Sequence, residues 1–192
     1  MTRRRYVMAT AIAASAFTVA FAAVAVLHPS PRVVWNASAS APIGLYRIQP
    51  DNDPPTGALV AVAPPARLAH WLSARGYLPE GVPLLKHVAA KAGQRVCRTG
   101  DVVSVDGRPV AIARARDGRG RMLPVWQGCR TLQIGELLLL NPAAPDSLDG
   151  RYFGPLPASA VIGRATPLHL RAATATPSPV QPKETDHARE HL

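Results

Sequence analysis

The sequence has few aromatic residues, few acidic residues and almost no lysine. Aromatic side chains make up 5% of the 192 residues, whereas glycine (14) and proline (20) are plentiful. That balance disfavours a long helical bundle and favours short strands joined by turns. Charged residues make up only 18% of the chain and hydrophobic residues 47%, which excludes a disordered polyelectrolyte.

Only three of the 22 basic residues are lysines, at Lys86, Lys91 and Lys183. The others are arginines, which keep their proton under protein conditions, so each lysine is a candidate for acid–base chemistry. The net charge is +10, and the excess is concentrated between residues 86 and 121. A single-strand nucleic-acid surface would interleave aromatic side chains with these charges, and that interleaving is absent. We expect no nucleic-acid partner and interpret this stretch as a solvated face near anionic lipid headgroups.

Charge is absent from one long stretch, Tyr6 to Leu27. At 1.5 Å per residue this stretch spans roughly 33 Å, enough to cross a hydrocarbon core of about 30 Å. Three arginines at residues 3–5 keep the amino end in the cytoplasm and send the rest of the chain across. A cleaved signal peptide is the alternative, although its apolar region is usually about 7–15 residues long. We predict a retained transmembrane anchor in residues 1–28, in a bacterial inner membrane, with the remainder in the periplasm.

Short β-rich segments follow the helix-breaking prolines at positions 29 and 31. We expect strands at 44–48, 58–63, 84–90, 95–98, 102–105, 108–113, 134–140 and 161–165. Asp-Gly pairs at positions 106, 117 and 149 indicate tight turns between them.

Only residues 66–75 have the apolar spacing of a helix. The sequence therefore predicts a mainly β, mostly antiparallel periplasmic domain over residues 29–171, with at most one short helix. Residues 172–192 are polar and rich in proline and threonine, which predicts a disordered, dispensable tail.

The two cysteines, Cys97 and Cys129, are 32 residues apart, which fits no Cys-x-x-Cys metal or redox motif. An even number of cysteines in an exported domain favours one structural disulfide. The six histidines show no metal-ligand spacing, and no glycine-rich phosphate loop is present. We expect neither a metal nor a cofactor.

Three segments carry candidate chemistry. In the first, residues 36–48, Ser38 and Ser40 alternate with alanine before Pro42. In an extended chain both hydroxyls would face one side. Small neighbouring side chains would leave room for a substrate backbone.

In the second segment, residues 83–96, Lys86 shares the apolar face of a predicted strand with Leu84 and Val88. Desolvation would lower its pKa and leave a neutral amine able to accept a proton. The alternative is a lysine that snorkels from an edge strand.

The third segment, residues 141–165, groups Ser147, Asp149 and Arg151 around a turn. A carboxylate beside an arginine is typical of an ion pair that fixes a loop.

Three motifs occur in a fixed order: a serine before a proline near the membrane, then Lys-His-Val-Ala-Ala-x-x-Gly, then Asp-Ser-x-Asp-x-Arg-Tyr-Phe-Gly. In this order, they resemble the motifs of the type I signal peptidase clan. The Ser-Ala-Pro-x-Gly-Leu-Tyr of the first segment resembles its TraF branch, the conjugative-transfer peptidases. The resemblance covers most of residues 36–168 and implies a signal-peptidase-like β domain. The sequence departs from the clan's pattern at His87, Gln94 and Asn141-Pro142.

Carried over by position, the resemblance implies a serine–lysine dyad with Ser40 as nucleophile and Lys86 as general base. Ser38 would share an oxyanion hole with the Ser40 amide. The remaining implied roles are those of Ser147, which would orient the lysine amine, and of Asp149 and Arg151, which would brace the site.

The resemblance implies a membrane-anchored serine endopeptidase that cleaves exported preproteins after small residues. Its partners would be a preprotein or prepilin substrate, inner-membrane lipid and conjugation machinery. The alternatives are a general type I signal peptidase and a non-catalytic periplasmic scaffold of a secretion or conjugation complex. A Ser-His-Asp triad using His87 or His70 is a rival catalytic scheme, although the sequence has no Gly-x-Ser-x-Gly elbow.

Overall fold

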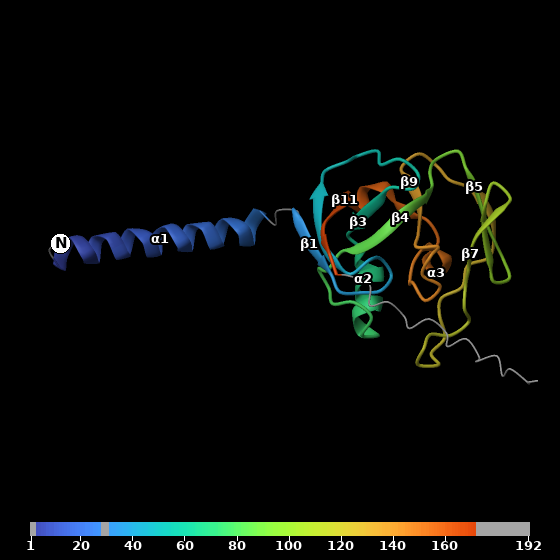
Figure 1. Cartoon of the computed structure of the whole chain (residues 1–192), viewed down its shortest axis with the longest axis horizontal. Coiled ribbons are helices and arrows are strands. Elements are labelled where there is room, and N and C mark those ends of the chain that lie inside the picture. The colour runs from blue at the N-terminus through green and yellow to red at the C-terminus, as the bar shows by residue number, and fades with distance from the viewer. Residues whose placement is uncertain (1–2, 28–30, 172–192) are drawn as a thin grey trace, which may run out of the picture.

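The computed structural model describes residues 3–27 and 31–171. Helix α1 (Arg3–Leu27) is a single apolar rod, drawn in blue in Figure 1, and none of its residues is buried. Its mean hydropathy of 2.2 over 18 residues and its length of 25 residues are sufficient to cross a membrane. The predicted tail, residues 172–192, lies outside the described residues.

The rest of the described chain is mainly β and antiparallel, as predicted, and forms two sheets (Figure 1). The larger sheet has the order β1 (Val33–Asn36), β2 (Gly44–Gln49), β11 (Val161–Leu170), β3 (Leu59–Val62), β4 (Leu84–Ala90), β9 (Glu136–Leu140) and β10 (Leu156–Pro157). The smaller sheet has the order β7 (Arg108–Ile112), β6 (Val102–Val105), β5 (Arg95–Thr99) and β8 (Gly128–Thr131). All eight predicted strands are present, and β1, β8 and β10 are additional.

Strand β9 is buried on both faces, because its four consecutive leucines pack into two different cores. Leu138 and Leu140 join a cluster that includes Val96 and Val103 of the smaller sheet. Leu137 and Leu139 join a second cluster with apolar residues of β3 and β4. A strand covered on both sides needs apolar residues at every position. This arrangement fixes β4, the neighbour of β9, in the interior of the larger sheet.

Residues 31–171 contain three short helical segments, where the sequence predicted at most one short helix. Helix α2 (Ala66–Ala74) is the predicted helix, and a 3₁₀ turn, η1, covers Ala158–Ala160. The one-turn helix α3 (Gly150–Phe153) replaces the tight turn predicted at Asp149-Gly150. It forms because the Asp149 side chain accepts the Arg151 backbone N–H at 3.1 Å, as an N-cap does. A Cβ at Gly150 would lie 2.8 Å from the Leu139 carbonyl oxygen, so glycine is required for this close approach.

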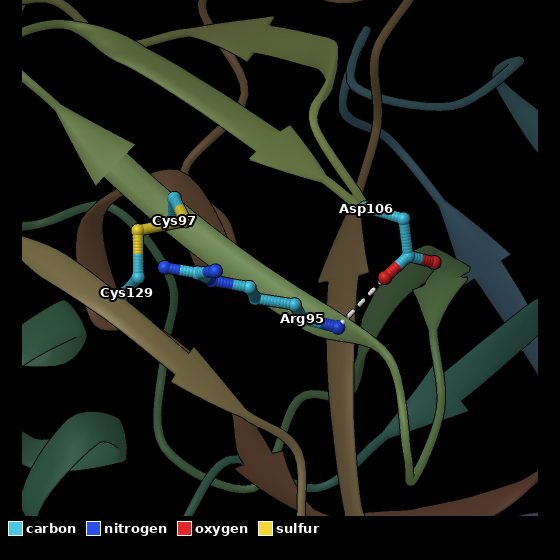
Figure 2. The surroundings of a disulfide bond; sticks show 4 residues. All are labelled: Arg95, Cys97, Asp106 and Cys129. Atoms are coloured by element: carbon cyan, nitrogen blue, oxygen red, sulfur yellow. Dashed lines mark hydrogen bonds between the residues drawn. A yellow bond between two sulfur atoms is a disulfide. The ribbon is translucent and has the colours of Figure 1, made fainter.

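The predicted disulfide between Cys97 and Cys129 is present (Figure 2). The two cysteines are directly opposed in β5 and β8, and their Cα atoms are 4.0 Å apart. On the same strand β5, the Arg95 backbone N–H donates to Asp106 Oδ1 at 2.8 Å (Figure 2). Strand β8 lies at the edge of its sheet, and all four of its residues are exposed. The disulfide therefore holds a strand that has little apolar burial of its own.

Removing this disulfide is expected to lower the free energy of unfolding by about 3 kcal/mol, because the unfolded chain regains loop entropy. The variant is Cys97→Ala with Cys129→Ala, and the measurement is urea unfolding with and without reductant. Reductant is expected to destabilise the wild type and to leave the double variant unchanged. Equal stability of the wild type and the variant would contradict the assigned role.

Candidate active site

Lys86 lies in the interior of the larger sheet. Its strand, β4, is paired on one side with β3 and on the other with β9, and Lys86 is opposite Val60. Only 3% of the residue is exposed. The alternative of a lysine snorkelling from an edge strand is therefore wrong, because β4 is not an edge strand.

The amine of Lys86 contacts a serine from a distant part of the chain. Nζ donates a hydrogen bond to Ser147 Oγ at 2.8 Å. Ser147 is buried in the loop between β9 and α3, where its own N–H donates to the Ala144 carbonyl at 3.0 Å. Within residues 31–171, no carboxylate oxygen lies within salt-bridge distance of Lys86. Ser147 is thus the side chain to which the amine is hydrogen-bonded in the described part of the chain.

A buried ion pair fixes the loop that carries Ser147. Arg151 Nε donates to Asp149 Oδ1 at 2.8 Å, and both side chains are almost fully buried. The second carboxylate oxygen of Asp149 accepts the Asn141 N–H at 2.9 Å. The Arg151 guanidinium also donates to the carbonyls of Asn141 at 2.9 Å and Ala144 at 3.2 Å. The Arg151 guanidinium is therefore hydrogen-bonded to both ends of the loop, at Asn141 and at Asp149.

Burial lowers the pKa of Lys86 from 10.5 to about 8. The main cause is the loss of water around the ammonium group, which disfavours its charged form. The Asp149 carboxylate raises this pKa, and the Arg151 guanidinium lowers it. Since Asp149 is itself paired with Arg151, its effect only partly offsets desolvation. A substantial fraction of Lys86 is therefore neutral near pH 8 and able to accept a proton.

Ser38 and Ser40 lie in a turn, not in the extended segment that their alternation with alanine predicted. Their hydroxyl oxygens are nevertheless 2.9 Å apart. Asn36 builds the turn, because its Oδ1 accepts the Ser38 N–H at 3.1 Å and the Ser38 hydroxyl at 3.0 Å. Its Nδ2 donates to the carbonyls of Ser38, Ala41 and Pro42 at 2.9, 3.0 and 3.0 Å.

These contacts determine which serine donates. The Ser38 hydroxyl donates its hydrogen bond to Asn36 Oδ1. Ser40 Oγ is therefore the donor in the hydrogen bond between the two serines. Among the described residues, the Ser40 N–H donates no hydrogen bond, and Ser40 Oγ makes no direct hydrogen bond to Lys86 Nζ. The nucleophile candidate and the base candidate are therefore neighbours in one site rather than a preformed pair.

One cleft brings the predicted residues together. It has a volume of about 520 Å³ and is lined by Ser38, Ser40, Lys86 and Ser147. Small side chains, those of Ala39, Ala143 and Ala144, form part of the same wall. Asp149 and Arg151 do not line the cleft, but Arg151 is hydrogen-bonded to the loop that carries Ser147.

The histidines are arranged differently from a Ser-His-Asp triad. His87, the residue after Lys86, has its ring Nδ1 3.1 Å from Asn141 Oδ1 and does not line the Lys86 cleft. His70 Nδ1 lies 3.3 Å from Glu80 at the surface. Within residues 31–171, the structure thus groups Ser40 with Lys86 in one cleft and assembles no Ser-His-Asp set.

Sequence reasoning missed two buried asparagines that hold the site. Asn36 organises the serine turn, and Asn141 donates from Nδ2 to the Leu85 carbonyl at 2.9 Å, which links β9 to β4. A signal for Asn36 was available, because asparagine two residues before a serine is typical of a turn closed by its side chain. Asn141 carried no such signal, since its partners are distant in sequence.

The chain belongs to a family of peptidases. A model of the signal peptidase family, peptidase S26, matches residues 3–169, so the chain belongs to the S26 signal peptidase family. Its relatives include the "Probable conjugal transfer protein TraF" of Sinorhizobium fredii, 39% identical over 141 residues, which are 68% of this chain and 73% of the relative.

Two further relatives agree. The "Conjugal transfer protein TraF" of Agrobacterium fabrum is 37% identical over 145 residues, covering 69% of this chain and 80% of the relative. The "Plasmid transfer protein TraF" of Escherichia coli is 35% identical over 138 residues, covering 66% of this chain and 77% of the relative. The predicted resemblance to the TraF branch is thus confirmed. Among solved structures, a signal peptidase I from Enterococcus faecalis V583 aligns with a TM-score of 0.36 and 19% identity, over 59% of this chain and 97% of that one.

Proposed function

We propose that the protein is a membrane-anchored serine endopeptidase in which Ser40 is the nucleophile and Lys86 the general base. The observation that carries this proposal is that Lys86, a buried lysine with its pKa lowered to about 8, lines the same cleft as Ser40. A serine hydroxyl is a weak nucleophile until a neighbouring base takes its proton. A neutral amine in an apolar wall supplies that base.

The reaction follows from these positions. Substrate binding turns the Ser40 hydroxyl from Ser38 toward the amine of Lys86, which Ser147 holds at 2.8 Å. Ser40 Oγ then attacks the scissile carbonyl while its proton passes to Lys86 Nζ. The protonated amine returns that proton to the leaving nitrogen. Water hydrolyses the resulting acyl-enzyme.

Two donors are available for the oxyanion. The Ser40 N–H has no acceptor within the described residues, and the Ser38 hydroxyl can turn from Asn36 toward the cleft. Each aimed donor in such a site contributes about 3 kcal/mol to transition-state stabilisation.

The substrate class follows from the cleft and the anchor. Alanines at positions 39, 143 and 144 leave room for a substrate backbone to come close to Ser40, which supports the cleavage after small residues that the resemblance implies. Ser40 follows the end of α1 by only 13 residues, which keeps the site near the bilayer surface. Arginines at 3–5 support an orientation in which α1 spans a bacterial inner membrane and the domain lies in the periplasm. The TraF relatives favour a precursor of a conjugation apparatus, such as a pilin, with that machinery as partner.

The test uses the full-length protein in liposomes with membrane-inserted precursors that carry alanines after their apolar segment. We expect a conjugative pilin precursor to be cleaved after a small residue, and Ser40→Ala to abolish cleavage while the protein stays folded. Mass spectrometry of the products gives the site. Preferential cleavage of a general secretory preprotein would favour a general signal peptidase, and cleavage of neither would favour a non-catalytic scaffold.

A further inference from the structure

A second cavity, of about 680 Å³, adjoins the Lys86 cleft, and Ser40 lines both. Lys86 lines only the first cavity and His87 only the second. This division follows from β4, because consecutive residues of a strand point to opposite sides. The proposed mechanism uses the first cavity alone and leaves the second without a role.

The second cavity combines an apolar wall with two basic residues. Alanine, proline and isoleucine side chains form most of it. Its basic residues are His87 and Arg171, and no carboxylate is among the described residues that line it. A negatively charged group entering this cavity would therefore meet an attractive charge beside an apolar wall.

Contacts with the surrounding chain set the chemistry of both basic residues. Asn141 Nδ2 donates to the Leu85 carbonyl, so its Oδ1 faces His87 and accepts from the ring Nδ1. The other ring nitrogen of neutral His87 is then an acceptor. The Arg171 N–H donates to the Ile43 carbonyl at 2.8 Å, which holds the backbone from which its exposed side chain extends beside the cavity. Arg171 is thus the permanent positive charge.

We propose that the second cavity binds the substrate on the opposite side of the cleaved bond from the first, and that Arg171 selects a carboxylate there. The assignment rests on the proposed role of Ser40, because a peptide attacked there continues past it on both sides. A guanidinium matches a carboxylate in two parallel hydrogen bonds. The carboxylate belongs either to an acidic side chain or to a free C-terminus of the substrate.

The test measures binding separately from cleavage. Full-length Ser40→Ala protein in micelles is titrated with fluorescein-labelled peptides of alanine, glycine and serine, which carry one Glu or Gln at successive positions. We expect Glu at one position to lower Kd about tenfold relative to Gln. A second pair of peptides, one ending in a free carboxylate and the other in a carboxamide, distinguishes a C-terminal carboxylate from that of an acidic side chain. Arg171→Gln is expected to remove the preference, and Arg47→Gln, an exposed arginine that lines neither cavity, to retain it.

Equal Kd values for every charged and neutral pair, a preference that survives Arg171→Gln, or no measurable binding would each overturn the inference. Cleavage by the wild type without any charge preference would refute the second cavity's role and leave the serine–lysine peptidase intact. Charge-selective binding to the Ser40→Ala variant without cleavage by the wild type would refute the peptidase and the assignment to one side of a cleaved bond, and would leave only the selection of a carboxylate by Arg171.

Discussion

Replacing Lys86 with arginine is expected to abolish cleavage, with kcat/KM lowered by roughly 10³-fold or more. Arginine keeps the positive charge, but its guanidinium does not lose a proton in proteins, so it cannot accept the proton of Ser40. Its larger head also has no room where Lys86 is 3% exposed and bonded to Ser147. The measurement is the rate of precursor cleavage, with thermal unfolding as the check on folding.

The matched control is Lys91→Arg. Lys91 follows directly after β4 and contacts Asp53 at the surface, a contact that arginine can also make. We expect this variant to cleave at the wild-type rate. If Lys86→Arg retained activity, the role of base would pass to His87, whose ring is held by Asn141 in the second cavity.

The pH profile gives a second readout of the same base. Lys86 accepts a proton only when it is neutral, and burial places its pKa at about 8. The rate is therefore expected to rise with pH up to about 8 and to level off above it. A rising limb that disappears in His87→Gln would instead identify the histidine as the base.

The fold was predictable where burial leaves a local pattern. The leucine run of β9 and the alternation in β5 and β6 each predicted a strand at the observed place. Strand β8 was missed because its four residues, Gly128–Thr131, are all exposed and show no apolar alternation. Helix α3 is a single turn, too short for any periodicity, and its formation depends on the Asp149 cap.

The candidate site divides in the same way. The burial of Lys86 could be predicted, since its apolar neighbours on β4 are adjacent in sequence. The pairing of Ser38 with Ser40 was predicted for the wrong reason, because the segment is a turn closed by Asn36 and not an extended chain. The second cavity had no sequence signal, since it forms where residues near positions 41, 87, 142 and 171 meet.

The ion pair behind the site is expected to control both the stability of the fold and the pKa of Lys86. Arg151→Met leaves the Asp149 carboxylate buried without its partner. Asp149→Asn likewise leaves the Arg151 guanidinium buried without its partner. Breaking a buried pair in this way costs about 3–5 kcal/mol, so each single variant is expected to be that much less stable. Urea unfolding of the full-length protein in micelles measures the loss. The double variant is expected to recover part of it.

The two single variants are expected to move the pH profile of cleavage in opposite directions. Asp149 raises the pKa of Lys86 and Arg151 lowers it. Asp149→Asn therefore lowers that pKa further and moves the rising limb of the rate below pH 8, whereas Arg151→Met moves it above pH 8. A purely structural brace would reduce the rate in both variants without shifting the limb. Shifts of the same sign would mean that Lys86 responds to the looser loop around Ser147 and not to the charges of the pair.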